Sequence, residues 1–223
     1  EARAPEGIDY DRWLGPAPLR PFNPRRLHFS FYFWWDYAGG MVSDWGVHLF
    51  DIVLWALGSD ILSVAATGGR HVFKDCRETP DTVDAVFECP DYIMAYSMRH
   101  GSGFPYHGAM DHGIMFFGTK AMLRIDRASF EIFPEGAREP ALTVKDQGQD
   151  QHHKLDFLAA VRSRKKPAAD ALCGHLAAIP GHLANISLRV GRKLVWDPKT
   201  ETIAGDREAS ALLAREYRAP YTL

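Results

Sequence analysis

Residues 39–58 read GGMVSDWGVHLFDIVLWALG and place ionisable side chains in an otherwise apolar stretch of this 223-residue chain. The pattern predicts a helix that begins after Gly39-Gly40, with Ser43 as its N-cap, and that ends at Gly58. At 3.6 residues per turn, the polar and aromatic side chains of this helix form one stripe, which consists of Asp44, His48, Asp51 and Trp55.

The ionisable side chains of this stripe have two interpretations. Because burying an unpaired charge is costly, they must either satisfy one another or line a cleft. In the structural interpretation, Asp44 is a helix-start charge, His48 is a hydrogen-bonded core histidine and Asp51 caps the packing. In the functional interpretation, Asp44 and His48 lie one turn apart and face a substrate hydroxyl, whose proton the histidine accepts. Spacing alone leaves both interpretations open.

The same residues belong to a longer pattern. Asp-x-Gly-x-His-x-x-Asp follows Gly-Gly and precedes Trp-x-x-Gly, and it resembles the start of the second domain of the Gfo/Idh/MocA oxidoreductases. These are nicotinamide-dependent enzymes that act on sugars, inositols and related polyols. In that family the first Asp and the His lie beside the substrate, and they match Asp44 and His48. Further segments resemble one bacterial branch of the family: residues 13–18, 23–26, 117–120 and 191–198.

The dinucleotide-binding part of such an enzyme is not found in this sequence. A Gly-x-Gly-x-x-Gly turn between a strand and a helix is expected there, but the glycines at 101 and 103 lack a third, and Pro105 would disrupt a following helix. The family's Glu-Lys-Pro motif, whose lysine assists proton transfer, is also missing. The resemblance therefore implies the substrate and oligomerisation domain alone, with NAD or NADP bound in the complete enzyme and no cofactor bound by this chain by itself.

Composition and charge restrict the remaining classes of function. The formal net charge is −2 and no basic, aromatic stripe is present, which argues against a nucleic-acid partner or a membrane surface. The three cysteines include no Cys-x-x-Cys pair, so neither a disulfide framework nor a zinc ribbon is indicated. The chain does not begin with Met, and we expect it to be a piece of a longer protein. The compartment is not assigned, because any export signal would lie upstream of Glu1.

Residues 1–38 are rich in proline, arginine and aromatic residues, which predicts an extended arm laid over a domain formed by residues 39–223. We expect residues 27–35 to be a strand-like or packed stretch. Its aromatic side chains either pack in the core or, in the alternative, Trp34 and Trp35 form a wall on which a sugar stacks. Tyr37 would add a hydroxyl to such a wall.

After Gly58 the pattern changes to a period of two. Strands are predicted in seven segments: residues 61–70, 82–89, 92–100, 113–118, 121–126, 129–133 and 142–145. Short turns make sequential strands antiparallel, so we predict an α+β fold with one large, open, mainly antiparallel sheet and helices on one face. Met94, Tyr96 and Met98 alternate as if one face were apolar. We expect that face to be buried against a second subunit, and the family resemblance implies sheet-to-sheet oligomers.

Two later segments supply further candidate site residues. The glycine-rich loop 101–111 follows a strand, and loops on a rigid sheet often carry function, so Tyr106, His107 and the neighbouring His112 are candidate ligand contacts. Helices are predicted over residues 151–164, 173–190 and 206–215. In the resembling family, a histidine on the second of these lies near the active cleft, and His182 is the candidate here.

Two classes of function follow. In the first, the chain is the substrate domain of an NAD(P)-dependent oxidoreductase, in which His48 takes a hydroxyl proton and Asp44 orients the hydroxyl. In the second, the chain acts without redox chemistry as a carbohydrate-active lyase, isomerase or hydrolase. A metal would then be held by a set of four side chains, Asp44, His48, His112 and His182. A simple carbohydrate-binding subunit is the remaining possibility.

Overall fold

The structure is a computed structural model that describes residues 2–104, 111–146, 148 and 150–222. It contains two compact units, and each is described by itself. The first consists of Glu1–Ser102 and Leu176–Leu223, and the second of Gly103–His175. The boundary predicted at residue 38 stays a prediction.

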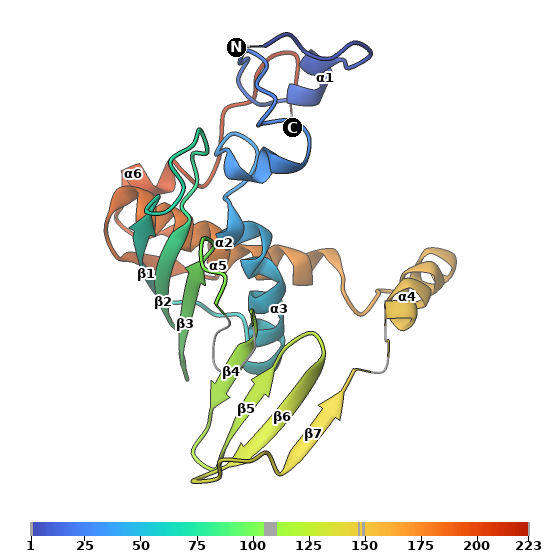
Figure 1. Cartoon of the computed structure of the whole chain (residues 1–223), viewed down its shortest axis with the longest axis vertical. Helices are drawn as coiled ribbons and strands as arrows, with labels where there is room; N and C mark the ends of the chain where they lie inside the picture. The colour runs from blue at the N-terminus through green and yellow to red at the C-terminus, as the bar shows by residue number, and fades with distance from the viewer. Residues whose placement is uncertain (1, 105–110, 147, 149, 223) are drawn as a thin grey trace. The chain divides into compact units, whose positions relative to one another are not determined.

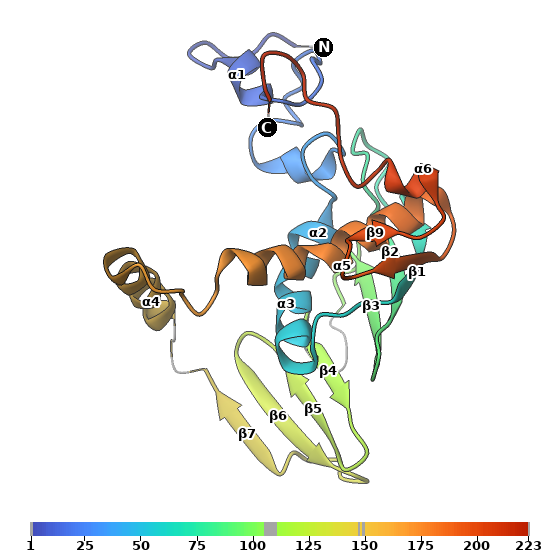
Figure 2. The ribbon, with the colours of Figure 1, turned by 180° about the vertical axis from the view of Figure 1, so that it is seen from behind.

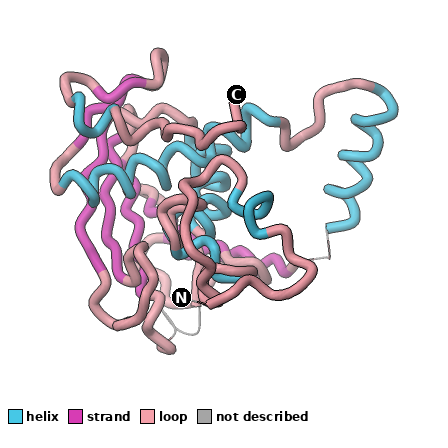
Figure 3. The backbone as a smooth tube through the Cα atoms, turned by 90° about the horizontal axis from the view of Figure 1, so that it is seen from above, coloured by secondary structure: helices cyan, strands magenta, loops and turns pink. Residues whose placement is uncertain are grey.

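The segment before residue 39 is mostly loop, as expected of an arm (Figure 3). It contains the helix α1 (Tyr10–Leu14) and the 3₁₀ helix η1 (Phe29–Phe33), so the aromatic run is helical rather than strand-like. The C-terminal tail holds the arm, because the Arg218 guanidinium donates to the Asp11 carboxylate at 2.8 Å and to the Ala17 carbonyl at 3.1 Å.

The central helix begins two residues before the predicted cap and has a short break. Gly40, with φ of +66°, precedes α2 (Met41–Asp44), and α3 (Gly46–Leu57) follows after Trp45. Ser43 is therefore inside α2, where its hydroxyl accepts a bond from the Gly39 N–H at 3.0 Å. The prediction that Ser43 caps the helix was wrong, because the flexible Gly40 makes the turn instead. The helix ends at Gly58, with φ of +96°, as predicted.

The first unit contains a five-stranded sheet, of which β1, β2 and β3 are labelled in Figure 1. Its order is β3-β2-β1-β8-β9, and all neighbouring strands are antiparallel. The bounds are Ser63–Gly69 for β1, Thr82–Glu88 for β2, Ile93–Arg99 for β3, Leu194–Asp197 for β8 and Thr202–Ile203 for β9. The C-terminal strands thus extend a sheet that begins with the hairpins after Gly58.

The apolar face of this sheet packs on the chain's own helices. Met94 and Met98 are buried, and the Tyr96 ring lies 5.1 Å from the ring of Phe50 on α3. Phe50 also meets Phe87 of β2, edge to face, at 5.6 Å. The expectation that Met94, Tyr96 and Met98 face a second subunit was therefore wrong, because the helices of the same chain bury these side chains first.

The long helix α5 (Ala171–Val190) precedes β8 and β9 in the chain and is bonded to β1 of the same sheet. Pro180 lies within it, and the part after Leu176 belongs to the first unit. The buried Ser187 hydroxyl accepts a bond from the Ala66 N–H of β1 at 3.0 Å and donates to the Arg192 carbonyl at 2.7 Å. The last helix, α6 (Arg207–Ser210), is shorter than predicted and stands beside β9 (Figure 2).

The second unit has a sheet of its own. It has the order β4-β5-β6-β7, again antiparallel, and the helix α4 (Asp150–Ser163) follows it. The bounds are Ile114–Phe117 for β4, Ala121–Ile125 for β5, Ser129–Pro134 for β6 and Leu142–Lys145 for β7. The α+β class with antiparallel sheets is confirmed. The predicted strands are divided between two sheets rather than joined in one, because no described residue of β4 pairs with β3.

Among the described residues, none of the helices combines the length and the hydrophobicity that crossing a bilayer requires.

Candidate active site

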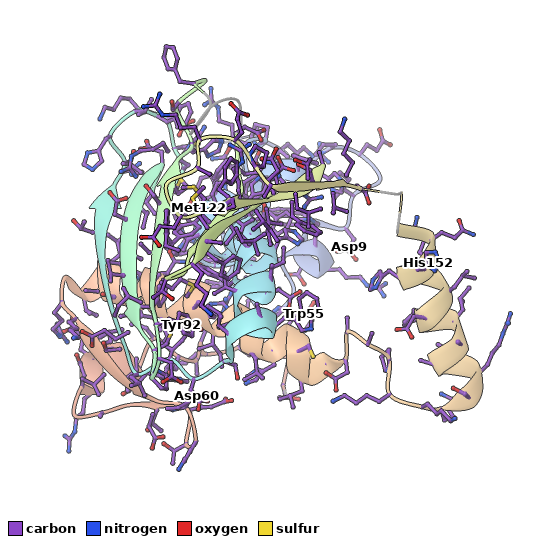
Figure 4. The ribbon with its side chains drawn as sticks, turned by 90° about the horizontal axis from the view of Figure 1, so that it is seen from below. Asp9, Trp55, Asp60, Tyr92, Met122 and His152 are labelled. Carbon is purple, nitrogen blue, oxygen red and sulfur yellow. The ribbon has the colours of Figure 1, made fainter. Side chains whose placement is uncertain are left out.

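The predicted stripe of α2 and α3 lies on the exposed side of these helices. Asp44, His48, Asp51 and Trp55 are all exposed, and Trp55 keeps 86% of its surface open to solvent (Figure 4). The opposite side of α3 supplies core residues, which are Gly46, Phe50, Val53 and Leu54. The ionisable groups are therefore accessible in this chain and are not sealed in its core.

The helix tightens between Asp44 and His48. The His48 N–H bonds to the Trp45 carbonyl three residues back, at 3.2 Å, and the His48 ring meets the Trp45 ring edge to face at 5.8 Å. A three-residue spacing is typical of a 3₁₀ turn. Asp44 and His48 thus lie on successive turns on either side of the break between α2 and α3.

The start of α2 is fixed by contacts to distant parts of the chain. The Gly40 N–H donates to the Tyr32 carbonyl at 2.8 Å, and the Asn185 side chain donates to the Gly39 carbonyl at 2.8 Å. A Cβ at Gly40 would lie 2.6 Å from Thr79, which is fully buried. The two glycines allow the backbone to pass between the Thr79 and Asn185 side chains, and this passage sets the position of Asp44.

Tyr32 of η1 is a site residue that the sequence analysis did not identify. Its ring is half-buried, and this burial is the main reason that the pKa of its hydroxyl is raised. The negative charge of Asp44 raises this pKa further, while the positive charge of Arg77 lowers it. No hydrogen bond to a described residue engages this hydroxyl. Tyr32 therefore offers a free phenol near the Asp44 carboxylate. It was overlooked because it lies within a run of seven aromatic residues in nine, where periodicity marks no single side chain.

Arg77 is held rigidly on the loop between β1 and β2. Its guanidinium lies 4.3 Å from the ring centre of Phe33 and 4.0 Å from that of Phe73, and it donates to the Asp75 carboxylate at 2.8 Å. Hydrogen bonds from Arg77 are the main reason that the pKa of Asp75 is lowered to about 2. The cation that acts on Tyr32 is thus fixed by two aromatic faces and an ion pair.

His182 lies where α5 crosses α2. A Cβ at the preceding Gly181 would be 3.1 Å from the Val42 carbonyl oxygen and 3.2 Å from the Ser43 Cα, so the two helices are in close contact there. The His182 side chain is partly open to solvent. Its surroundings exclude water from part of the ring and, with the positive charge of Arg215, lower the pKa of His182. His182 is therefore neutral at pH 7.

The aromatic candidates of the arm differ in access. Trp34 is only 6% exposed and the Arg26 guanidinium covers its ring at 4.6 Å, which favours packing over a sugar wall. The Tyr37 hydroxyl is buried without a partner among the described residues, and burial raises its pKa to about 12. Trp35 is half-buried, with the Arg189 guanidinium 5.2 Å above its ring. Of the two tryptophans, Trp35 is thus the more exposed.

The loop candidates lie outside the described part of the first unit. Tyr106 and His107 lie outside the described residues, and His112 belongs to the second unit, where its Nδ1 bonds to the Asp111 carboxylate at 2.6 Å. Among the residues that the structure describes, no three His, Cys, Asp or Glu side chains are grouped as a metal site requires. The set of Asp44, His48, His112 and His182 is accordingly not found as a ligand cluster.

Comparison with known proteins gives the family of the chain. The family model described as "Oxidoreductase family, C-terminal alpha/beta domain" of the Gfo/Idh/MocA proteins matches residues 1–75 and 137–223, which is most of the chain. The chain belongs to the Gfo/Idh/MocA oxidoreductase family. The resemblance inferred from the Asp44–His48 motif is confirmed, and the oxidoreductase class is established at the level of the family.

Solved structures of this family share the fold of the chain. A Thermotoga maritima protein named as an oxidoreductase has a TM-score of 0.59 at 22% identity, and the match covers 74% of this chain and 50% of that one. A myo-inositol dehydrogenase from Corynebacterium glutamicum has a TM-score of 0.51 at 18% identity, over 72% and 50% of the two chains. A UDP-N-acetylglucosamine 3-dehydrogenase from Acidithiobacillus ferrooxidans has a TM-score of 0.52 at 15% identity, over 82% and 57%.

The chain spans about half the length of these Gfo/Idh/MocA structures. No curated protein sequence matches it significantly. At these identities the structural similarity establishes the α+β fold, and the substrate has to be argued from the side chains of the site.

Proposed function

We propose that this chain is the substrate-binding and catalytic domain of an NAD(P)-dependent oxidoreductase that acts on a sugar, an inositol or a related polyol. The observation that carries the proposal is the accessible pair of Asp44 and His48 beside the free hydroxyl of Tyr32. The names of two family members with the same fold, an inositol dehydrogenase and a nucleotide-sugar dehydrogenase, support this class of substrate.

The residues of this chain would bind and deprotonate a substrate hydroxyl. His48 is the proton acceptor, because histidine is the side chain that most often serves as a general base. The Asp44 carboxylate accepts a hydrogen bond from a neighbouring hydroxyl and so orients the substrate. The Tyr32 phenol donates to a second oxygen and fixes the ring of the substrate. With these two groups bound, the proton of the reacting hydroxyl is left to point at His48.

The cofactor is assigned to the complete enzyme. This sequence has no glycine-rich turn for a dinucleotide, so we assign none of its residues to holding one. When bound, a nicotinamide supplies the hydride acceptor, and the side chains described above handle the proton.

The test is the variant His48→Ala in the complete enzyme. General-base catalysis contributes about 10²- to 10⁴-fold, so we expect kcat to fall by that factor while the melting temperature stays the same, because His48 is exposed. NAD(P)H formation with D-glucose, myo-inositol and sugar acids as substrates is the measurement, and His28→Ala, an exposed histidine of the arm, is the matched control. A kcat within about threefold of the unmodified enzyme would remove His48 from proton transfer.

We also propose that two copies of the chain associate through the outer face of the five-stranded sheet. On this face, opposite the helices, Val86, Ile93 and Val195 are 46%, 63% and 55% exposed. The strand register aligns Ala65, Val86 and Ala95 in one row across three strands. Such a flat apolar row is well suited to burial against another sheet.

The charges on the outer face are balanced, which favours a second copy as the partner. Asp84 pairs with Arg99 at 2.7 Å, and Glu88 pairs with Lys193 at 2.6 Å. Because these four charges are already paired within the chain, they can meet their own copies with little repulsion between like charges.

A further inference from the structure

Three basic side chains lie close to Trp35 and its neighbour Asp36 or act on one another there. His182 and Arg189 lie two turns apart on α5 and share a face, and Arg189 places its guanidinium 5.2 Å above the Trp35 ring. Arg215, from the C-terminal tail, donates to the Asp36 carbonyl and acts electrostatically on His182. All three side chains are exposed. We call His182, Arg189 and Arg215 the basic cluster.

The two arginines of the basic cluster have no carboxylate partner among the described residues. Two acids near Trp35 are engaged by Arg20. The Asp36 carboxylate pairs with Arg20, and Glu78 pairs with Arg20 at 3.3 Å and accepts a bond from the Trp35 N–H at 3.0 Å. Arg189 and Arg215 are therefore two exposed cations that form no ion pair with a carboxylate of the described residues.

Two members of the basic cluster, His182 and Arg189, are connected to the proposed substrate site through α5. This helix crosses α2 at Gly181, where a Cβ would lie 3.2 Å from the Ser43 Cα, one residue before Asp44. One turn beyond His182, the Asn185 side chain bonds to the Gly39 carbonyl. His182 and Arg189 thus lie on the helix that holds the backbone just before the Asp44–His48 pair.

We propose that the basic cluster binds an anionic group of the substrate, so that the enzyme acts on a sugar carrying a carboxylate or a phosphate rather than on a neutral polyol. This inference rests on the proposed function and adds the charge of the substrate to it. The shared chemistry is a group with two or more anionic oxygens, which matches the planar fork of an arginine side chain.

The geometry of each member suits this role. A guanidinium stacked on an indole keeps its in-plane N–H groups free to donate, and the stacking limits the entropy lost on binding. Arg215 is already oriented through its bond to the Asp36 carbonyl. A neutral His182 can donate one further hydrogen bond, and the uncovered part of the Trp35 ring can contact the C–H face of a sugar.

The experiment measures binding and turnover separately in the complete enzyme. Binding of D-glucuronate, glucose 6-phosphate, D-glucose and myo-inositol is measured by titration calorimetry, and turnover by NAD(P)H formation. The variants are Arg189→Gln, Arg189→Lys and Arg215→Gln, and the control is Arg138→Gln, an exposed arginine of the second unit. Arg189→Gln is the cleanest, because among the described residues the Arg189 side chain forms no hydrogen bond or ion pair that would be lost, and its guanidinium lies over the ring of Trp35.

We expect either D-glucuronate or glucose 6-phosphate to bind more tightly than D-glucose and myo-inositol. Which of these two acids binds more tightly shows whether the site takes a carboxylate or a phosphate. Arg189→Gln and Arg215→Gln should each weaken that acid about 10- to 100-fold and leave D-glucose within about twofold, while Arg189→Lys recovers part of the loss. Arg138→Gln should change neither the affinity for the acid nor the affinity for D-glucose. A loss restricted to the acid is an effect that general destabilisation cannot produce.

The possible failures of the two proposals differ. If neutral sugars bind as tightly as the acids, or if the arginine variants weaken all four compounds equally, the anion site is wrong whether or not turnover is seen. If an acid binds with the expected dependence on Arg189 but is not oxidised, the anion site stands and the oxidoreductase proposal fails for that compound.

Discussion

Tyr32 shows how one residue can connect the arm to the site. Its carbonyl holds Gly40 at the start of α2, and its hydroxyl, free of described partners, lies within the electrostatic reach of Asp44. The same residue therefore both positions the carboxylate and offers a donor beside it. Its hydroxyl makes no structural hydrogen bond, which allows its function to be tested without disturbing the fold.

We expect Tyr32→Phe to lower kcat/KM about tenfold, the cost of one hydrogen bond to the substrate, and to leave the free energy of unfolding unchanged. Steady-state kinetics and urea unfolding are the measurements. The matched control is Tyr92→Phe, because the Tyr92 hydroxyl donates to the Gly58 carbonyl at 2.8 Å. That variant should lose about 1 kcal/mol of stability and keep its kcat/KM. Equal kinetics in Tyr32→Phe and the unmodified enzyme would show that this phenol does not contact substrate.

At the scale of the elements, the start of α2 depends on a glycine in a restricted position. Gly40 has φ of +66° and its missing Cβ would lie 2.6 Å from Thr79. We expect Gly40→Ala to cost about 2 to 4 kcal/mol, from both the backbone conformation and the collision with a buried side chain. Gly58→Ala, with φ of +96° but no atom within 4 Å of a new Cβ, has the backbone strain without the collision and should cost about 1 to 2 kcal/mol. Urea unfolding measures both, and equal losses would contradict the packing described at Thr79.

The loop between β1 and β2 is held by one buried carboxylate. Asp81 is 1% exposed and accepts bonds from the N–H groups of His71, Val72 and Phe73, at 3.0, 3.0 and 2.9 Å, and from the Thr82 hydroxyl at 2.9 Å. Burial alone would raise the pKa of Asp81, but these four donors outweigh it and lower the pKa to about 2. This loop carries Arg77 and Glu78, so Asp81 also supports the surroundings of Tyr32.

Because the pKa of Asp81 is lower in the folded state, its stabilisation is fully present above pH 5 and is lost as the pH falls toward about 2. We expect Asp81→Asn to lose about 2 kcal/mol at pH 7 and to depend less steeply on pH below 4, by urea unfolding at a series of pH values. Asp60→Asn, an exposed carboxylate (Figure 4), is the control and should change little. An unchanged acid dependence in Asp81→Asn would exclude this residue as the source.

At the scale of the whole molecule, the outer face of the five-stranded sheet remains uncovered within the first unit. If it forms the contact between copies, Val86→Lys should raise the dissociation constant of the dimer about 100-fold, because a lysine would be buried in an apolar row. Sedimentation over a range of protein concentrations is the measurement. Val72→Lys, an equally exposed valine outside this face, should leave the assembly intact. A dimer that tolerates Val86→Lys would move the contact to another surface.

Local patterns predicted most of the elements of this chain. The seven predicted strands are found within two residues of their expected ends, and α5 and the terminator Gly58 are found as expected. Alternation and helical spacing are properties of neighbouring residues, so they are visible without a structure. The site was predicted only in part, because Asp44 and His48 form a local motif whereas Tyr32, Arg77 and Arg215 do not.

The sequence by itself determined the antiparallel α+β class, the helical stripe of Asp44, His48, Asp51 and Trp55, and the family to which the chain belongs. Only the tertiary structure decided that the strands form two sheets, that Met94 and Met98 face the chain's own helices, and that the C-terminal Arg215 acts on His182. The reason is physical. Secondary structure follows from side-chain periodicity within a few residues, but contacts such as Asn185 with Gly39 join residues 146 positions apart, which no local pattern specifies.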